Sequence, residues 1–189
     1  QCISDHIIER RDGCSRDEEA IFEDAIYFPG AQSALICSDR GTATIEAYPQ
    51  GSKNKEQNIK AYKHWAGPND KIEVMFTDNA PELTSACRAL GWRNPTSTPG
   101  VHETNGYAER INRKVRDGTR ASLKMAGFIP AWWATAIVYT CMAGNIRPSQ
   151  AQVEHLGTMT SYEARHGEPF PGLEAAFGQL VNFMATPTR

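Results

Sequence analysis

The stretch Thr96–Val115 (TSTPGVHETNGYAERINRKV), read with Phe76–Leu83 (FTDNAPEL), decides the fold of this chain. The apolar run at 72–76 (IEVMF) predicts a buried strand that delivers Asp78 just past its end. The longer stretch places Glu109 in the first turn of a predicted helix, after a loop that contains proline and glycine. Two acids therefore follow or open regular elements, which is where side chains of a shared site are expected.

Outward from these stretches, the apolar pattern predicts alternating strands and helices. Short β-prone runs predict strands around 2–9, with Asp5 in or beside the first, and then at 33–38 and 42–48, joined by a hairpin turn. Helical spacing predicts helices over about 53–65, 81–90, 107–126 and 130–145. This order predicts an α/β fold with a mixed sheet. In such sheets, ligands usually bind beyond the carboxyl ends of the strands.

Composition fits an intracellular globular protein. Hydrophobic residues make up 40% and charged residues 22% of the 189 positions, and no apolar run is long enough to cross a membrane. The start, QCISDHII, lacks the features of a signal peptide, so a nuclear or cytoplasmic location is expected. Five scattered cysteines show no metal-binding spacing and predict reduced thiols rather than a zinc site.

Net charge is −2, which alone argues against binding nucleic acid, but the charges are segregated. Residues 1–50 hold ten acids and four bases, whereas residues 101–150 hold seven bases and three acids. Such segregation can leave one basic face on a nearly neutral protein.

Three separated carboxylates suit one chemistry in particular. Mg²⁺ and Mn²⁺ prefer hard anionic oxygen ligands, and a pair of such ions can clamp the attacking and leaving oxygens of a phosphodiester. Asp5, Asp78 and Glu109 come from three different predicted elements and could meet beyond the strand ends. A single acid is most often a solvated surface charge, so the argument depends on the three converging.

The local motifs resemble the catalytic core of retroviral-type integrases, closest to the Ty1/copia retrotransposon branch. FTDNAPEL is similar to the family segment with the second acid, and the T-P…N-G-x-A-E-R-x-N-R pattern of the third is matched by Thr98, Pro99, Asn105, Gly106, Ala108, Glu109, Arg110, Asn112 and Arg113. The resemblance implies a ribonuclease H-like fold with a mixed five-stranded sheet flanked by helices. It implies metal-dependent DNA 3′-end processing and strand transfer, with Asp5, Asp78 and Glu109 holding two Mg²⁺ or Mn²⁺ ions.

The resemblance extends past the core. Met159–Gly167 (MTSYEARHG) and the later Phe177-Gly178 are similar to the segment that follows copia cores. We therefore expect a core over 1–148 and a mostly irregular post-core segment over 149–189. Double-stranded DNA, as element ends and as target, and further copies of the chain are the implied partners. Departures are Ala80 in place of the usual glycine, a shortened interval from Asp78 to Glu109, and a stretch of only four residues before Asp5, in which no zinc-binding module is expected.

The longest predicted helix has a basic face. Glu109, Arg113, Arg116 and Arg120 recur at helical spacing, while Tyr107, Ala108, Ile111, Val115 and Leu123 can face a core. The predicted DNA-binding residues are Asn105, Arg110, Arg113, Lys114, Arg116 and Arg120. A solvated helix with internal ion pairs would look similar. Trp132 and Trp133 are expected in the core rather than on a base-stacking surface.

Other assignments remain open. Glu103 and Glu82 are rival or supporting acids, and His102 could contact substrate, although a loop histidine is more often plain surface. A nuclease of ribonuclease H type acting on RNA–DNA hybrids would use the same carboxylates. A catalytically decayed or domesticated DNA-binding module would keep the fold and lose the chemistry.

Overall fold

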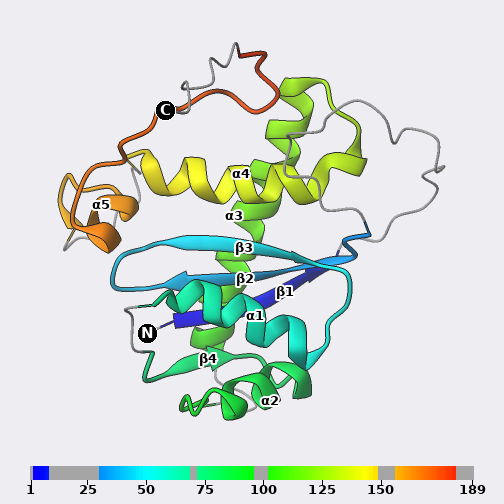
Figure 1. Cartoon of the computed structure of the whole chain (residues 1–189), viewed down its shortest axis with the longest axis vertical. Coiled ribbons are helices and arrows are strands. Elements are labelled where there is room, and N and C mark those ends of the chain that lie inside the picture. The colour runs from blue at the N-terminus through cyan, green and yellow to red at the C-terminus, as the bar shows by residue number, and fades with distance from the viewer. Residues whose placement is uncertain (1, 9–29, 69–71, 96–101, 149–155, 182–189) are drawn as a thin grey trace, which may run out of the picture.

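The chain folds into three layers (Figure 1). Helices α1 (Lys55–Ala66) and α2 (Pro81–Ala89) cover one face of a sheet, and α3 (His102–Ala126) and α4 (Trp133–Ile146) pack on the other. This computed structural model describes residues 2–8, 30–68, 72–95, 102–148 and 156–181, with the backbone alone for 2–8 and 102–105. The α/β prediction is confirmed.

The sheet has the order β3-β2-β1-β4 in the described residues. Its strands are β1 (Cys2–Ile8), β2 (Ser33–Asp39), β3 (Ile45–Gln50) and β4 (Met75–Thr77). β2 is antiparallel to both β1 and β3, whereas β4 is parallel to β1, so the sheet is mixed as predicted.

The resemblance implied a fifth strand without placing it, and outside the four named strands the described part of the chain has a single parallel bridge between Val74 and Arg93. Gly91, at φ 72°, ends the turn before it, and Pro95 has no N–H to donate after it. The described sheet therefore has four strands rather than the expected five.

Side chains alternate across β2 and thereby separate two apolar clusters. Ala34 and Ile36 join the cluster formed with α3 and α4, which includes the buried Trp133. Leu35 and Cys37 join the cluster formed with α1 and α2. This two-residue period is what a strand buried on both faces requires. The core position predicted for Trp133 is confirmed, and the half-buried Trp132 packs against the same cluster, whereas Tyr62 and Trp65 are buried in the cluster on the other face.

Helix α3 begins at His102, five residues before the predicted start at Tyr107. The loop prediction for 102–106 was therefore wrong, and Glu109 lies two turns into the helix rather than in its first turn. Gly106 suggested a break, but one glycine costs a helix only about 1 kcal/mol relative to alanine. A 25-residue helix with a packed face absorbs that cost.

The β2–β3 turn is closed by the carboxylate of Asp39. It accepts hydrogen bonds from the N–H and hydroxyl of Thr42, at 3.0 and 2.9 Å, and from the N–H of Gly41 at 3.2 Å. Ala43 has a positive φ of 56° in the same turn. The turn therefore uses residues 42–44, which were predicted as the start of the next strand.

The described part of the segment after residue 148 packs on the core. Its short helix α5 (Ser161–His166) begins at a capping box between Thr160 and Glu163. The Ser161 hydroxyl donates to the Ala43 carbonyl at 3.2 Å, and Arg165 stacks over the Trp65 ring, 4.2 Å from its centroid. These contacts join α5 to both the β2–β3 turn and α1.

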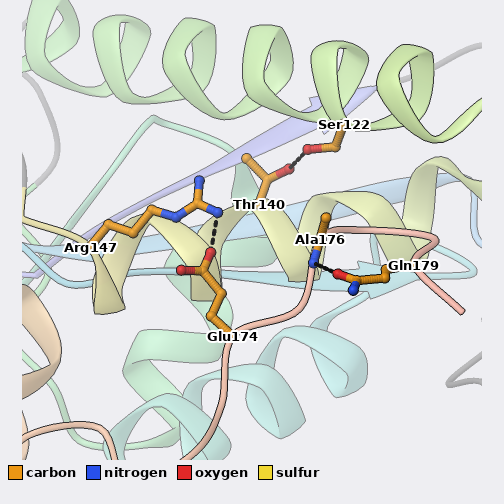
Figure 2. Close-up of polar contacts among 6 residues, drawn as sticks. All are labelled: Ser122, Thr140, Arg147, Glu174, Ala176 and Gln179. Atoms are coloured by element: carbon orange, nitrogen blue, oxygen red, sulfur yellow. Dashed lines mark hydrogen bonds and ion pairs between the residues drawn. The ribbon is translucent and has the colours of Figure 1, made fainter. Parts of the chain in front are cut away.

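Further along, the segment returns to α3 and α4. Figure 2 shows Glu174 paired with Arg147 at the end of α4, and Gln179 accepting from the Ala176 N–H at 3.0 Å to close a turn. Phe177 lies against Phe128 and Tyr139, with ring centroids 5.6 and 5.4 Å apart. The same view shows Ser122 of α3 beside Thr140 of α4, which are hydrogen-bonded.

Cys37, Cys87 and Cys141 are buried and form no disulfide. Burial raises the pKa of Cys87 to about 11 and that of Cys141 to about 12, so both thiols are protonated and unreactive at neutral pH. Among the described helices, none combines the length and apolarity that a membrane crossing would need.

Candidate functional site

The register between β1 and β4 brings two of the predicted acids to adjacent positions. Cys2, Ile3 and Ser4 pair with Met75, Phe76 and Thr77. The ladder ends there, and the next residue is Asp5 on β1 and Asp78 just past the end of β4. Neighbouring strands lie about 4.8 Å apart, so the two positions are close enough to share a ligand.

The same register assigns a face to position 5. Asp5 is paired with Ile36 of β2, and Ile36 belongs to the cluster under α3 and α4. Directly paired residues of neighbouring strands share a face of the sheet. Position 5 therefore falls on the α3 side of the sheet, the side on which Glu109 is carried.

Asp78 is exposed and begins a tight turn into α2. Its Oδ1 accepts from the Ala80 N–H at 3.1 Å, and Pro81 opens the helix one residue before its first-turn acid, Glu82. Ala80 has φ −65°, an ordinary value for an alanine. The family's glycine is therefore not required here, and this departure does not disturb the turn that holds Asp78.

Asn94 ties the end of β4 in place. Its Nδ2 donates to the Met75 carbonyl at 2.8 Å and to the Thr77 hydroxyl oxygen at 3.0 Å. The Thr77 hydroxyl in turn donates to the Asp78 carbonyl at 2.8 Å. Nothing in the sequence singles out Asn94, because an Asn-Pro pair beside further prolines and threonines is typical of a turn.

Glu109 lies exposed on α3, and the helix is fixed just before it by Tyr107. The half-buried Tyr107 ring lies under the guanidinium of Arg40, 4.5 Å from Cζ to the ring centroid. Burial raises the pKa of the Tyr107 phenol, against the opposing effects of its hydrogen bond with Ser38 and the charge of Arg40. The β2–β3 turn thus holds α3 two residues from Glu109. The contact with Arg40 was not predicted.

The basic row on α3 faces solvent. Its exposed members are Arg110, Arg113, Lys114, Arg116 and Arg120, and Lys124 extends it toward the end of the helix. Arg120 also pairs with Asp117, 3.8 Å away on the same helix, an exposed contact worth little. On the opposite side, Val115 and Leu123 are buried as predicted.

Several predicted positions lie outside the side chains that the structure describes. They are Asp5, His102, Glu103 and Asn105. Glu82 is half-buried in the first turn of α2, where an acid is also favoured by the helix dipole. Among residues with described side chains, no three His, Cys, Asp or Glu form a metal-binding group, a set that leaves out Asp5.

In sequence, the chain is similar to one curated relative. It is 33% identical over 84 residues to the retrovirus-related Pol polyprotein from transposon TNT 1-94 of Nicotiana tabacum. The match covers 42% of this chain and 6% of the polyprotein, so the chain corresponds to a small part of that relative's length. No family model matches the chain.

Solved structures share the fold over most of the chain. The HTLV-2 integrase catalytic core in complex with magnesium has a TM-score of 0.57 at 15% identity, covering 87% of this chain and 95% of that one. The BIV integrase catalytic core has a TM-score of 0.53 at 14% identity, covering 86% of this chain and 90% of that one. A simian T-cell lymphotropic virus intasome in complex with PP2A regulatory subunit B56 gamma has a TM-score of 0.61 at 16% identity. The match covers 96% of this chain and 59% of that one.

The chain is an α/β protein with the ribonuclease H-like fold. This class follows from its three layers, its strand order and its similarity to the solved integrase cores. Within that class it resembles the catalytic cores of retroviral-type integrases, as its motifs predicted, and its sequence similarity is to a retrotransposon Pol polyprotein.

Proposed function

We propose that this chain is the catalytic core of a DNA integrase, which processes DNA 3′ ends and transfers them to target DNA for a retrotransposon-like element. One observation carries the proposal. The parallel ladder of β1 and β4 ends at the pair Ser4 and Thr77, and the next residues along the two segments are Asp5 and Asp78; position 5 pairs with Ile36 on the side of the sheet covered by the helix that carries Glu109. The resemblance to integrase cores and to a retrotransposon polyprotein supports the same activity.

The donor set of this site fits divalent cations. Asp5, Asp78 and Glu109 offer carboxylate oxygens, and Asp78 and Glu109 are both exposed, so they are accessible to a hydrated ion. The three residues would hold two Mg²⁺ or Mn²⁺ ions, and the HTLV-2 core was solved in complex with magnesium. Bound ions would supply Lewis-acid stabilisation of the oxygens at the reacting phosphorus.

The chain's own residues would position the DNA. Arg113, Arg116 and Arg120 lie on the exposed face of α3 that also carries Glu109, so a phosphate backbone along this helix would pass the carboxylates. Phosphate contacts of this kind fix the position of DNA without reading its sequence. Lys114 and Arg110 would add to the same charge, and Asn105 is proposed to contact DNA where the helix begins.

We further propose that the protein works as a homo-oligomer on double-stranded DNA, since HTLV-2 integrase cores were solved in dimeric and trimeric forms. The core would span residues 1–148, and residues 149–189 would form the post-core segment that packs on it.

The test is strand transfer of an end-mimicking DNA duplex in Mg²⁺ and Mn²⁺. Asp78→Asn and Glu109→Gln should each lower the rate at least ~100-fold, because such ligands support several kcal/mol of transition-state stabilisation and ~1.4 kcal/mol is tenfold. Glu56→Gln, an exposed acid in the first turn of α1 on the other side of the sheet, is the matched control and should keep full activity.

Two results would redirect the assignment. Cleavage of RNA–DNA hybrids in preference to strand transfer would indicate a nuclease of ribonuclease H type. Salt-dependent DNA binding by a folded protein that shows no turnover in either metal would indicate a decayed or domesticated DNA-binding module.

A further inference from the structure

Asp78 directly follows β4, which is a short strand. β4 has three residues and lies at the edge of the described sheet; on its outer side the backbone of Arg93 bonds Glu73 and Met75, and Thr77 and Asp78 lie beyond that pairing. The Asp78 side chain is exposed and packs on no core cluster. A carboxylate that must stay within a few tenths of an ångström of a metal-binding position needs a further restraint.

The restraint is supplied by a residue distant in sequence. The Asn94 amide donates twice to the β4 segment, once to the Met75 carbonyl and once to the Thr77 hydroxyl oxygen, next to the backbone bonds that Arg93 makes there. Because a carbonyl can only accept, the Nδ2 atom must be the one that faces Met75. The Thr77 hydroxyl then passes the restraint on to the main chain of Asp78.

The oxygen of the same amide indicates that Asn94 is not placed there for its own hydrogen bonding. Asn94 Oδ1 is buried and accepts no hydrogen bond among the described residues. A buried acceptor without a partner is destabilising, and conflicts of this kind are concentrated at functional sites. The asparagine is therefore better explained by what its donors hold than by its own contribution to the core.

We propose that Asn94 is a positioning residue for Asp78, acting through Thr77 to fix the acid at the end of β4 for divalent-cation binding. The inference rests on the proposed function, since it assigns a support to one of the proposed metal-binding residues. Residues that orient metal ligands typically change metal affinity or activity about 10–100-fold when they are lost.

The test measures Mn²⁺ alone binding to the full chain, by electron paramagnetic resonance of the free ion, beside strand-transfer kinetics. Asn94→Leu removes both donors at similar volume, and Thr77→Val removes the relaying hydroxyl. Both should weaken Mn²⁺ binding about tenfold and lower kcat with little change in the KM for DNA. Thr77→Ser keeps the hydroxyl and should restore both to within about twofold of the unmodified protein.

Asn145 supplies a matched control. It is a buried asparagine whose amide also makes two bonds to one strand, accepting from the Ile45 N–H at 3.0 Å and donating to the Ile45 carbonyl at 2.8 Å. Asn145→Leu should lower the melting temperature without a specific change in Mn²⁺ affinity. If Asn94→Leu shifts Mn²⁺ affinity no more than Asn145→Leu does, the positioning role is wrong.

Failure of this inference is distinguishable from failure of the proposed function. If Asp78→Asn loses Mn²⁺ binding while Asn94→Leu and Thr77→Val keep it, only the positioning role is overturned. If Asp78→Asn binds Mn²⁺ like the unmodified protein, the proposed site is wrong and the positioning role falls with it. If Asn94→Leu does not fold, the difference in Mn²⁺ affinity between Thr77→Val and Thr77→Ser tests the positioning role instead.

Discussion

Asp39 contributes to stability through its charge, so its contribution should depend on pH. Although partial burial raises the pKa of this carboxyl, hydrogen bonds from Thr42 and Gly41 outweigh it, and the pKa is lowered below 3.8. A depressed pKa in the folded state means that the stabilisation is complete above the unfolded pKa and is lost as pH falls through the folded one.

We expect Asp39→Ala to lower the free energy of unfolding by about 1–2 kcal/mol at pH 7. The difference between the two proteins should shrink below about pH 4, where the carboxyl begins to be protonated in the unfolded chain. Urea unfolding at a series of pH values measures this difference in the free energy of unfolding. A difference that stays constant from pH 7 to pH 3 would show that the charge is not involved.

Individual site residues differed in how far the sequence revealed them. Asp78 and Glu109 could be proposed from the sequence because each stands in a recognisable motif, although only Asp78 lies at an element boundary. Asn94 could not, because its partners Met75 and Thr77 are distant in the chain and nothing local to Asn94-Pro95 indicates them. The contact of Arg40 with Tyr107 likewise joins a turn to a helix far along the chain.

At the scale of elements, apolar periodicity predicted which segments are strands and helices better than where they end. α2 was predicted within a residue because Pro81 and Gly91 mark its limits. The start of α3 was misplaced because tertiary packing overrode the helix-breaking tendency of Gly106. β4 came out shorter than its apolar run, since only β1 offers it a continuous ladder in the described sheet.

The approach of α3 to α4 depends on Gly118. A Cβ at this position would lie 2.6 Å from Cγ2 of Thr140, whose hydroxyl is held by the Ala136 carbonyl at 2.8 Å. Thr140 is β-branched and cannot easily rotate away. Gly118→Ala should therefore destabilise the protein by about 1–2 kcal/mol, although alanine favours helix.

Gly144 of α4 is the matched control, because no atom lies within 4 Å of a Cβ built there. Gly144→Ala should stabilise the protein by about 0.5–1 kcal/mol through helix propensity alone. Urea denaturation of the two variants gives both values. If Gly118→Ala and Gly144→Ala change the free energy of unfolding equally, the close contact between α3 and α4 at Gly118 is contradicted.

At the scale of the whole molecule, the post-core segment is expected to contribute to the stability of the core it packs on. Phe177→Ala removes the ring that lies between Phe128 and Tyr139, and should lower the free energy of unfolding by about 1–3 kcal/mol. Leu173→Ala, in the same segment but 99% exposed, should change it by less than about 0.5 kcal/mol.

Thermal unfolding by calorimetry compares the two variants and should show one cooperative transition in each. If Phe177→Ala is as neutral as Leu173→Ala, the segment does not dock on α3 and α4 in solution. The sequence motif after residue 148 indicated kinship but not this packing, because the contacts join residues from distant parts of the chain.

The convergence of Asp5, Asp78 and Glu109 is the claim on which the proposed chemistry depends. Anomalous diffraction from a crystal of the protein soaked in Mn²⁺ tests it most directly. We expect Mn²⁺ between Asp5 and Asp78, about 2.1 Å from a carboxylate oxygen of each, with Glu109 facing the same ion or its neighbour. Mn²⁺ bound elsewhere at saturating concentration, with the Asp5 and Asp78 carboxylates turned apart, would contradict it.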